Sequence, residues 1–374
     1  MRFFSYKDRP VHLGPFPLER LRRSQEAPAI DRLPEMEPLS FHSDDPQSLT
    51  RAMARFMGMF DTVRDGAIVH GEAEVPADPG ERTRHLKAAG YYFDASMVGI
   101  ARLEDGHFLA QPFRNPVIEQ IKEELEAGQP KSYAAGVDMI YADILESART
   151  TLQPARHHTH ALVFLVEYAR DPRPDEPGTD WLHGTQAERA ALLTANTAVL
   201  LANYLRMLGF EARAHSATTS EVDLRRLAVS AGLAGVVEDG GGAAIENPYV
   251  GRRFGLAAIT TTMELEPDLP LGRDLGRDGL ASHGPAWWLG KGTARNAATA
   301  EPYRDREFRM GPHPFEKLKR REEPTTFIDE ERVPRFPKRA DFFARALFGD
   351  MGKPVQEAAK GGMYVIKSPS GACA

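Results

Sequence analysis

Apolar residues form two kinds of segment that alternate between about residues 46 and 262. Some segments repeat apolar residues at helical spacing, and others are short runs of the length of a buried strand. The predicted helices span residues 46–64, 79–89, 115–128 and 185–209, and a fifth runs from Ser220 and Asp223 to Gly232. The predicted strands are Met97 to Leu103, Ala161 to Tyr168, Phe210 to His215 and a threonine-rich strand around Thr260 to Thr262. This alternation predicts an α/β (α+β) fold, a sheet with flanking helices.

Local signals define the ends and faces of these helices. Gly90 is expected to end the second helix, and Asn115 to cap the third. Thr185 and Glu188 have capping-box spacing at the start of the fourth helix. Apolar or small residues cover most of that helix, so we expect it to be the buried central helix. The apolar face predicted for the first helix consists of Leu49, Met53, Phe56, Met57 and Phe60.

Proline marks two less regular regions outside a core at residues 49–272. Seven prolines lie within residues 1–48, which favours an extended arm because each proline removes a backbone donor. The apolar residues of this arm are expected to pack onto the core: Phe3, Phe4, Tyr6, Leu13, Phe16 and Leu18. Residues 273–374 are predicted to be a second arm, anchored by Trp287 and Trp288 and holding one helix near 340–348.

Composition excludes several classes of protein. With 374 residues, 42% hydrophobic and 27% charged, the chain has the composition of a globular protein with a core. A net charge of −6 argues against nucleic-acid binding. No apolar run reaches the roughly 18 to 20 residues of a membrane span, and the first residues lack a signal-peptide pattern. We therefore expect a cytoplasmic protein without a membrane partner.

Reactive side chains are sparse. Cys373 is the single cysteine, which excludes an internal disulfide and any cluster held by cysteines of this chain. His157, His158 and His160 are the densest group of possible metal ligands, but alternate residues of a strand point to opposite faces, so three ligands would need a turn to converge. We expect ordinary surface histidines and no metal site there.

The most distinctive local chemistry lies between His215 and Leu271, where a helix, a glycine-rich loop and a strand follow one another as in a cofactor cradle. Gly240 and Gly241 are explained by a flexible turn or by room for a bulky planar cofactor. Arg252 and Arg253 would form an ion pair or a solvated turn, or would hold a phosphate or carboxylate. The candidate cradle residues are His215, Ser216, Gly240, Gly241, Asn247, Arg252 and Arg253.

Several motifs, in order, resemble those of the cytoplasmic catabolic reductive dehalogenases. They cover about residues 85–272 and read SMVGIARL after GYYFDA, then LVFLVEY, NYLRMLGFEARAH, LAVSAGLAGV and IENPYVGRRFGLAAITTTMELEPDLPL. The resemblance implies a nitroreductase-like core. In long members of that family this core occurs twice: the second copy binds cobalamin and precedes two cysteine motifs for iron–sulfur clusters, and the first copy is degenerate.

This chain departs from the family's catalytic pattern, because it has no cluster cysteines and no match for the tyrosine and basic residues that act on the halide. The resemblance therefore predicts the amino-terminal, non-catalytic half, as a separate product or a truncated chain, with an empty cradle and no cofactor of its own. Cobalamin and two 4Fe–4S clusters are expected in the missing catalytic half. That half, or a second copy of this chain, is the expected partner. The alternative is a stand-alone nitroreductase-like oxidoreductase that binds a corrinoid or flavin.

Overall fold

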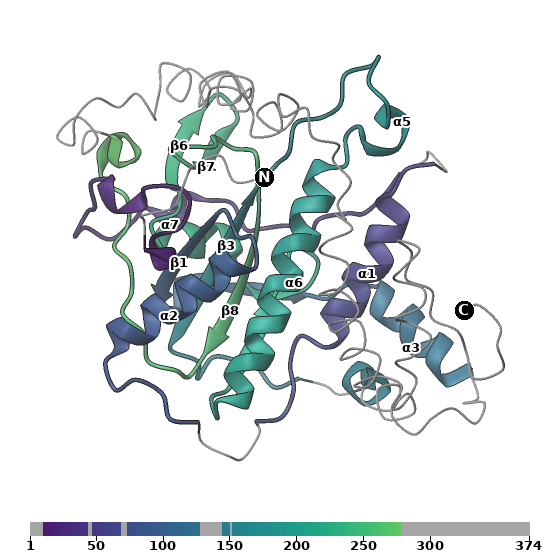
Figure 1. The fold of residues 1–374 in the computed structure, drawn as a ribbon, viewed down its shortest axis with the longest axis horizontal. Helices are drawn as coiled ribbons and strands as arrows, with labels where there is room; N and C mark the ends of the chain where they lie inside the picture. Colours follow the sequence, from purple (N-terminus) through teal and green to yellow (C-terminus); the bar gives the residue numbers. More distant parts are fainter. Residues whose placement is uncertain (1–9, 44–46, 69–72, 128–143, 150–151, 278–374) are drawn as a thin grey trace, which may run out of the picture. The chain divides into compact units, whose positions relative to one another are not determined.

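The structure is a computed structural model that describes residues 10–43, 47–68, 73–127, 144–149 and 152–277 (Figure 1). It contains a mixed α/β arrangement in which helices pack on an antiparallel sheet, as the alternating pattern predicted. The predictions for Phe3, Phe4, Tyr6, Trp287 and Trp288, and for the helix near residues 340–348, lie outside the described residues.

Four antiparallel strands form the central sheet, in the order β1 (Met97–Arg102), β3 (His160–Glu167), β8 (Phe254–Thr261) and β4 (Ala212–His215). Every residue of β3 from His160 to Val166 is buried, so the prediction of a strand covered on both faces is confirmed. Because β3 and β4 both pair antiparallel with β8, they run parallel to each other and begin at the end of the sheet where β8 finishes.

The two faces of the sheet bury different side chains, since successive strand residues point in opposite directions. Val98, Ile100, Leu162 and Phe164 pack under the helices α2 (Pro79–Tyr92) and α6 (Gln186–Met207). The residues between them face a second layer. That layer contains α7 (Leu224–Ser230), the hairpin of β6 (Gly235–Asp239) and β7 (Gly242–Glu246), and part of the amino-terminal arm.

Further helices extend the α6 side of the molecule. Helix α1 (Thr50–Thr62) packs on α6, α3 (Val117–Ala127) packs on α1, and the short α5 (Thr179–Leu182) precedes α6. The strands β2 (Phe108–Phe113) and β5 (Ser220–Val222), neither of them predicted, pair with each other. Met57 of α1 is fully buried against α6, but Leu49 and Phe56 are 42% and 55% exposed, so the predicted apolar face of α1 was partly wrong.

Close packing against the sheet explains why Gly90 does not end α2. A Cβ at Gly90 would lie 2.8 Å from Cγ2 of Val98, so this glycine lets the helix approach β1 and continue to Tyr92. Gly255 does the same for α6, because a Cβ there would lie 2.8 Å from Cβ of Ala190. Both glycines therefore set how closely the helices lie on the sheet.

Two predicted helix starts also differ from the structure. Residues 220–222 form β5, and α7 begins only at Leu224, capped by Asp223, whose carboxylate accepts hydrogen bonds from the backbone N–H groups of Arg225 and Arg226. Thr185 makes no side-chain cap at α6; its hydroxyl donates to the carbonyl of Leu182 at 2.9 Å.

Helix α6 is not buried all round, contrary to the prediction. One stripe of it faces outward, with Leu193, Leu200, Tyr204 and Met207 between 37% and 53% exposed. The remaining faces pack on β8, β4, β3 and α1. No helix in the described residues is long and apolar enough to cross a membrane.

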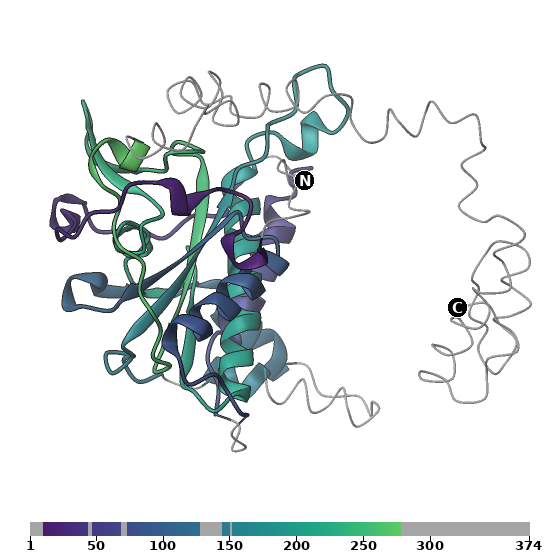
Figure 2. The ribbon, with the colours of Figure 1, turned by 60° about the vertical axis from the view of Figure 1, so that its left-hand side comes forward.

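The middle of the amino-terminal arm, residues 16–36, lies across the sheet on the α7 side, whereas its first described turn packs on α2 (Figure 2). It forms three short 3-10 turns, at Val11–Leu13, Leu18–Arg20 and Ile30–Arg32. Its buried apolar residues belong to the same cluster as the sheet: Phe16, Leu18, Leu21, Ile30 and Leu33. Arg23 fixes the arm through hydrogen bonds to the carbonyls of Gly232 (2.7 Å) and Leu269 (3.0 Å).

Candidate functional site

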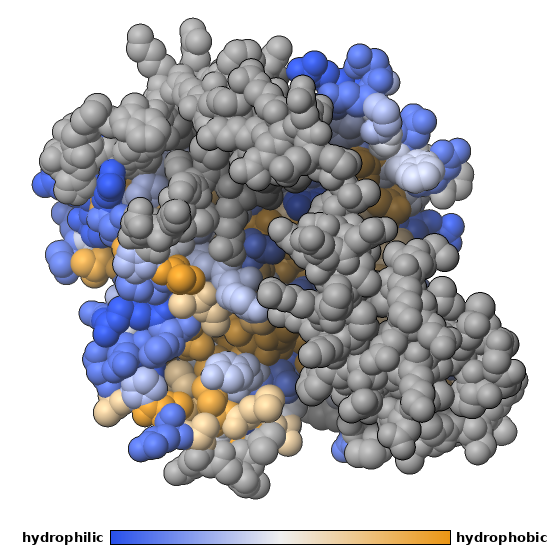
Figure 3. Space-filling view, in the orientation of Figure 1, coloured by the Kyte–Doolittle hydropathy of each residue, from blue (hydrophilic) through white to orange (hydrophobic). Residues whose placement is uncertain are grey.

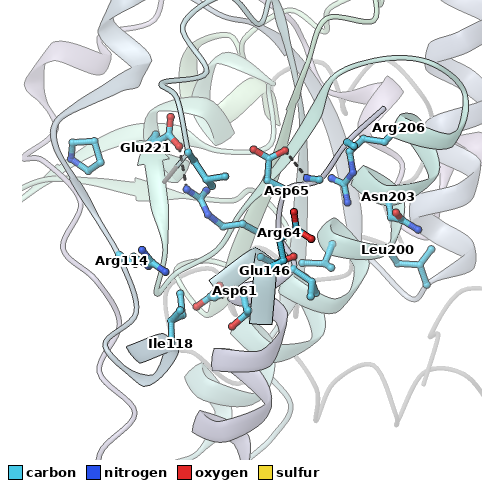
Figure 4. Close-up of a pocket in the computed structure, with 18 of the residues that line it drawn as sticks. Asp61, Arg64, Asp65, Arg114, Ile118, Glu146, Leu200, Asn203, Arg206 and Glu221 are labelled. Carbon is cyan, nitrogen blue, oxygen red and sulfur yellow. Dashed lines mark hydrogen bonds and ion pairs between the residues drawn. The ribbon is translucent and has the colours of Figure 1, made fainter. Parts of the chain in front are cut away.

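A cavity of about 1160 Å³ opens between α1, α6 and the segment that joins β2 to α3 (Figure 4). Its walls combine apolar residues such as Ile118 and Leu200 with an unusual number of charged groups. Its volume lies above the range of roughly 300 to 1,000 Å³ that is common for ligand sites. The charged lining residues are Asp61, Arg64, Asp65, Arg114, Glu146, Arg206 and Glu221.

Buried ion pairs build one wall of this cavity. Oε1 of Glu221 accepts hydrogen bonds from Arg213 (2.6 Å) and Arg64 (3.0 Å), and Arg213 also reaches Oδ2 of Asp65 at 2.6 Å. Burial alone would raise the pKa of Glu221, but the Ala155 N–H and the two guanidinium groups outweigh burial, and the pKa lies below its ordinary value. Glu221 is therefore ionised at neutral pH and neutralises the wall.

Asp61, at the end of α1, is the other buried acid. Its carboxylate accepts hydrogen bonds from the Ser216 hydroxyl (2.6 Å) and the Asn115 side-chain amide (2.9 Å), and also from the Thr218 hydroxyl. Burial raises the pKa of Asp61 even though these hydrogen bonds favour the charged form. Asp61 therefore ties α1 to the segment after β4 through Ser216 and Thr218, and to the segment that joins β2 to α3 through Asn115.

His215 is completely buried behind this wall. Its Nε2 lies 2.9 Å from the Thr260 hydroxyl, which also lies 2.8 Å from Nδ1 of His158. Because Nδ1 of His215 accepts the Glu221 backbone N–H at 3.3 Å, the proton of the neutral ring is on Nε2. Burial, followed by the charges of Arg64 and Arg213, lowers the pKa of His215 well below its ordinary value.

The predicted cradle residues occupy two different parts of the structure. His215 and Ser216 contact residues of the cavity wall, Glu221 and Asp61. Gly240 and Gly241 form the exposed turn of the β6–β7 hairpin, which belongs to the layer on the other face of the sheet from α6. A Cβ at Gly240 would meet nothing within 4 Å. Of the two interpretations of this glycine run, the turn is the one that corresponds to its geometry in the structure.

The remaining three predicted residues stabilise the chain beyond that hairpin. The side-chain oxygen of Asn247 accepts the N–H groups of Tyr249 (2.8 Å) and Val250 (3.0 Å), and its amide donates to the Leu233 carbonyl at 2.6 Å. Arg252 lies 3.8 Å from Glu246, and Arg253 lies 3.4 Å from Asp171. Their contacts are those of structural turns and ion pairs.

The charges that line the cavity are largely engaged with the protein itself. Arg206 donates to the Ala212 carbonyl at 2.8 Å and Arg114 to the Ala148 carbonyl at 3.0 Å. Acidic and basic lining residues are nearly equal in number, so the cavity is not a strongly positive site for a phosphate. The arrangement suits a shaped polar pocket better than nucleophilic catalysis.

Sequence reasoning missed most of this site, including Asp61, Arg64, Asp65, Arg206 and Glu221. One signal was present: Arg213 is a charged residue within the predicted strand Phe210 to His215, and all four residues of β4 in the structure are buried. Charged residues are rarely buried without a partner, so a buried acid was to be expected close to it.

No protein-family model matches the chain, and no curated protein sequence matches it. Solved structures do. The catabolic reductive dehalogenase NpRdhA in complex with 3-bromo-4-hydroxybenzoic acid is 32% identical, with a TM-score of 0.61, over 96% of this chain and 44% of that chain. An N-terminally tagged NpRdhA structure is 33% identical, with the same TM-score and coverage.

A third structure, described as suggesting a mechanism for B12-dependent dehalogenation, is 31% identical over 96% of this chain and 44% of that chain, with a TM-score of 0.60. The chain thus spans less than half the length of these relatives and corresponds to their amino-terminal part. The resemblance inferred from the motifs is confirmed.

Proposed function

Because this chain is related, over nearly its whole length, to the amino-terminal part of the catabolic reductive dehalogenases, we propose that it is the amino-terminal module of such a system. In this proposal it supports a second segment that removes halide from an organohalide. The observation that carries the proposal is the coverage: 96% of this chain aligns with only 44% of the relative. The segment that performs the chemistry would correspond to the rest of the relative.

The residues of the chain support a non-catalytic role. A single cysteine cannot provide the four thiolates that hold a 4Fe–4S cluster. The lining residue Asp61 and the residues behind the cavity wall, His215 and Ser216, are hydrogen-bonded to protein neighbours. We therefore place cobalamin and two 4Fe–4S clusters in the catalytic segment, keep the nitroreductase-like core as our interpretation of the sheet and its helices, and propose a cytoplasmic location.

An apolar surface on the α2 and α6 side is available to that segment. Figure 3 shows apolar side chains gathered over these helices, and a groove of about 560 Å³ runs between them. Tyr92 (76% exposed), Leu200 (40%) and Tyr204 (45%) line it. Contiguous exposed apolar surface of this kind marks protein contacts. We propose that the catalytic segment packs on this groove.

Association measurements test the groove. The purified chain is expected to self-associate in light scattering, because its groove lacks the catalytic segment, and the double variant Leu200→Ser, Tyr204→Ser is expected to be monomeric. Trp181→Ser is the matched control, since Trp181 is 57% exposed on α5 and does not line the groove. A catalytic segment from a related dehalogenase, added in trans, should replace the self-association. If the wild-type chain is a monomer in light scattering and does not bind the added catalytic segment, the proposal is refuted.

The alternative function is a stand-alone oxidoreductase that binds a corrinoid or flavin, and the large cavity beside α1 favours it. Purification with hydroxocobalamin or FMN, followed by desalting and an absorbance spectrum, separates the two functions. The module is expected to emerge colourless. Stoichiometric colour that is lost in the variant Asn203→Trp, which narrows the cavity, would establish the alternative.

A further inference from the structure

A second cluster of polar side chains lies at the end of the sheet where β3 and β4 begin. His157 and His158 precede β3, and Glu211 precedes β4. Both strands flank the end of β8: the Thr159 N–H donates to the Thr261 carbonyl at 3.0 Å, and the Thr262 N–H donates to the Glu211 carbonyl at 3.1 Å. The sheet therefore brings together residues 53 and 54 positions apart in the sequence.

One ligand atom from each of these three side chains lies within 4.8 Å of the others. Nε2 of His158 is 3.6 Å from Oε2 of Glu211, and Nε2 of His157 bonds directly to the same oxygen. Two ligands on one tetrahedral zinc ion, each about 2.0 to 2.2 Å from the metal, lie about 3.3 Å apart. His157 and Glu211 are half-exposed, so small rotations of their side chains reach that geometry.

The buried histidine is already prepared to act as a ligand. The side chain of His158 is only 3% exposed. Its Nδ1 is engaged at 2.8 Å by the Thr260 hydroxyl, which leaves Nε2 directed at Glu211. Ligating histidines are commonly oriented in this way through their second ring nitrogen. The positive charge of the nearby Arg213 is compensated by its ion pairs with Asp65 and Glu221.

The expectation of three surface histidines was wrong for two of them, since His158 and His160 are buried and only His157 is exposed. His160 is the first residue of β3, and its Nδ1 bonds to the Thr159 hydroxyl at 2.9 Å. His157 lies in the turn before that strand, and Glu211 takes the third place in the cluster. Two imidazoles and one carboxylate are a common set of protein ligands for zinc at sites that keep an open position.

We propose that His157, His158 and Glu211 bind a divalent first-row transition metal ion, with water completing the coordination. This inference rests on the close approach of the segments that precede β3 and β4, and it is independent of the proposed role as a dehalogenase module. Zn²⁺ is the probe, and Co²⁺ reports the geometry because its visible spectrum distinguishes tetrahedral from octahedral ligands.

The test uses the untagged chain, stripped of metal with a chelator and titrated with ZnCl₂ in a calorimeter. One equivalent of Zn²⁺ is expected to bind, and Co²⁺ is expected to give a tetrahedral spectrum. His157→Ala combined with Glu211→Gln should abolish both signals. His85→Ala with Glu81→Gln is the matched control, because that exposed His–Glu pair, 3.7 Å apart, is not part of a three-ligand cluster within the described residues.

Circular dichroism establishes that each variant is folded before its titration is interpreted. His160→Ala should keep the site, since His160 is outside the cluster. If the wild-type chain binds no stoichiometric Zn²⁺, or if the double variant binds it as the wild type does, the cluster is only a histidine–glutamate ion pair and the proposal is refuted.

Discussion

Glu221 holds the cavity wall together, and replacing it with glutamine tests that role directly. Glutamine keeps the size of the side chain but removes its charge. In the wild type the carboxylate accepts hydrogen bonds from Arg213 (2.6 Å), Arg64 (3.0 Å) and the Ala155 N–H (3.0 Å). A glutamine oxygen can accept from only part of this set, and its NH₂ group would face other donors.

The expected loss follows from burial. The side chains of Glu221, Arg213 and Arg64 are 12%, 8% and 11% exposed, so solvent screens little of the two ion pairs that Glu221 makes. Breaking a buried ion pair by removing one partner costs about 3 to 5 kcal/mol. Since Asp65 still neutralises Arg213, we expect the lower end, about 3 kcal/mol, in the free energy of unfolding.

Urea denaturation provides the assay, because a lower midpoint with an unchanged slope reports a loss of stability alone. Glu238→Gln is the control: Glu238 and its partner Arg32 are 50% and 59% exposed, and removing such a pair costs less than about 1 kcal/mol. If Glu221→Gln loses no more stability than Glu238→Gln, the inference that a buried ion network holds the wall is wrong.

Three further substitutions test other parts of the structure. Gly255→Ala should lose about 1 to 3 kcal/mol in urea denaturation, because the methyl group would press on α6, whereas Gly240→Ala in the open turn should be nearly neutral. Burial lowers the pKa of His215, so below about pH 6.5 the unfolded chain binds a proton there that the folded chain does not, and the free energy of unfolding decreases as the pH is lowered. The variant His215→Gln should make this pH dependence shallower by up to about 1.4 kcal/mol per pH unit. An unchanged pH dependence would contradict a buried neutral ring. Asp223→Ala should lose about 2 kcal/mol in thermal unfolding, since its carboxylate caps α7 and also accepts the Met36 N–H at 2.9 Å; a loss under about 0.5 kcal/mol would show that water replaces the cap.

The elements that the sequence predicted well are those with strong local signals. The continuous apolar run Ala161 to Tyr168 predicted a strand buried on both faces, and the structure has β3 at His160–Glu167. The helical spacing over residues 185–209 corresponds to α6 at Gln186–Met207. In both cases the pattern of apolar residues within one segment was sufficient.

Elements that depend on distant partners were not predictable in this way. Strand β5 has only three residues and forms because it pairs with β2. Its own sequence, with Ser220 and Asp223, resembled the start of a helix. The cavity wall joins Asp65 to Arg213, which are 148 positions apart in the chain, and no local spacing indicates such a pair. The same holds for Glu211, whose place beside His157 follows only from the order of the strands.

The amino-terminal arm has a consequence for how this protein is made. Phe16, Leu18 and Leu21 complete a core that also contains residues of α7 and β8, and Arg23 bonds to the Leu269 carbonyl. During synthesis the arm leaves the ribosome more than 200 residues before these partners, since Arg23 and Leu269 are 246 positions apart in the chain. Contacts of such long range slow folding and leave apolar surface uncovered during synthesis. The nascent chain must therefore carry an unpaired arm until nearly all of the core has emerged, which makes that interval the one in which a chaperone would be needed.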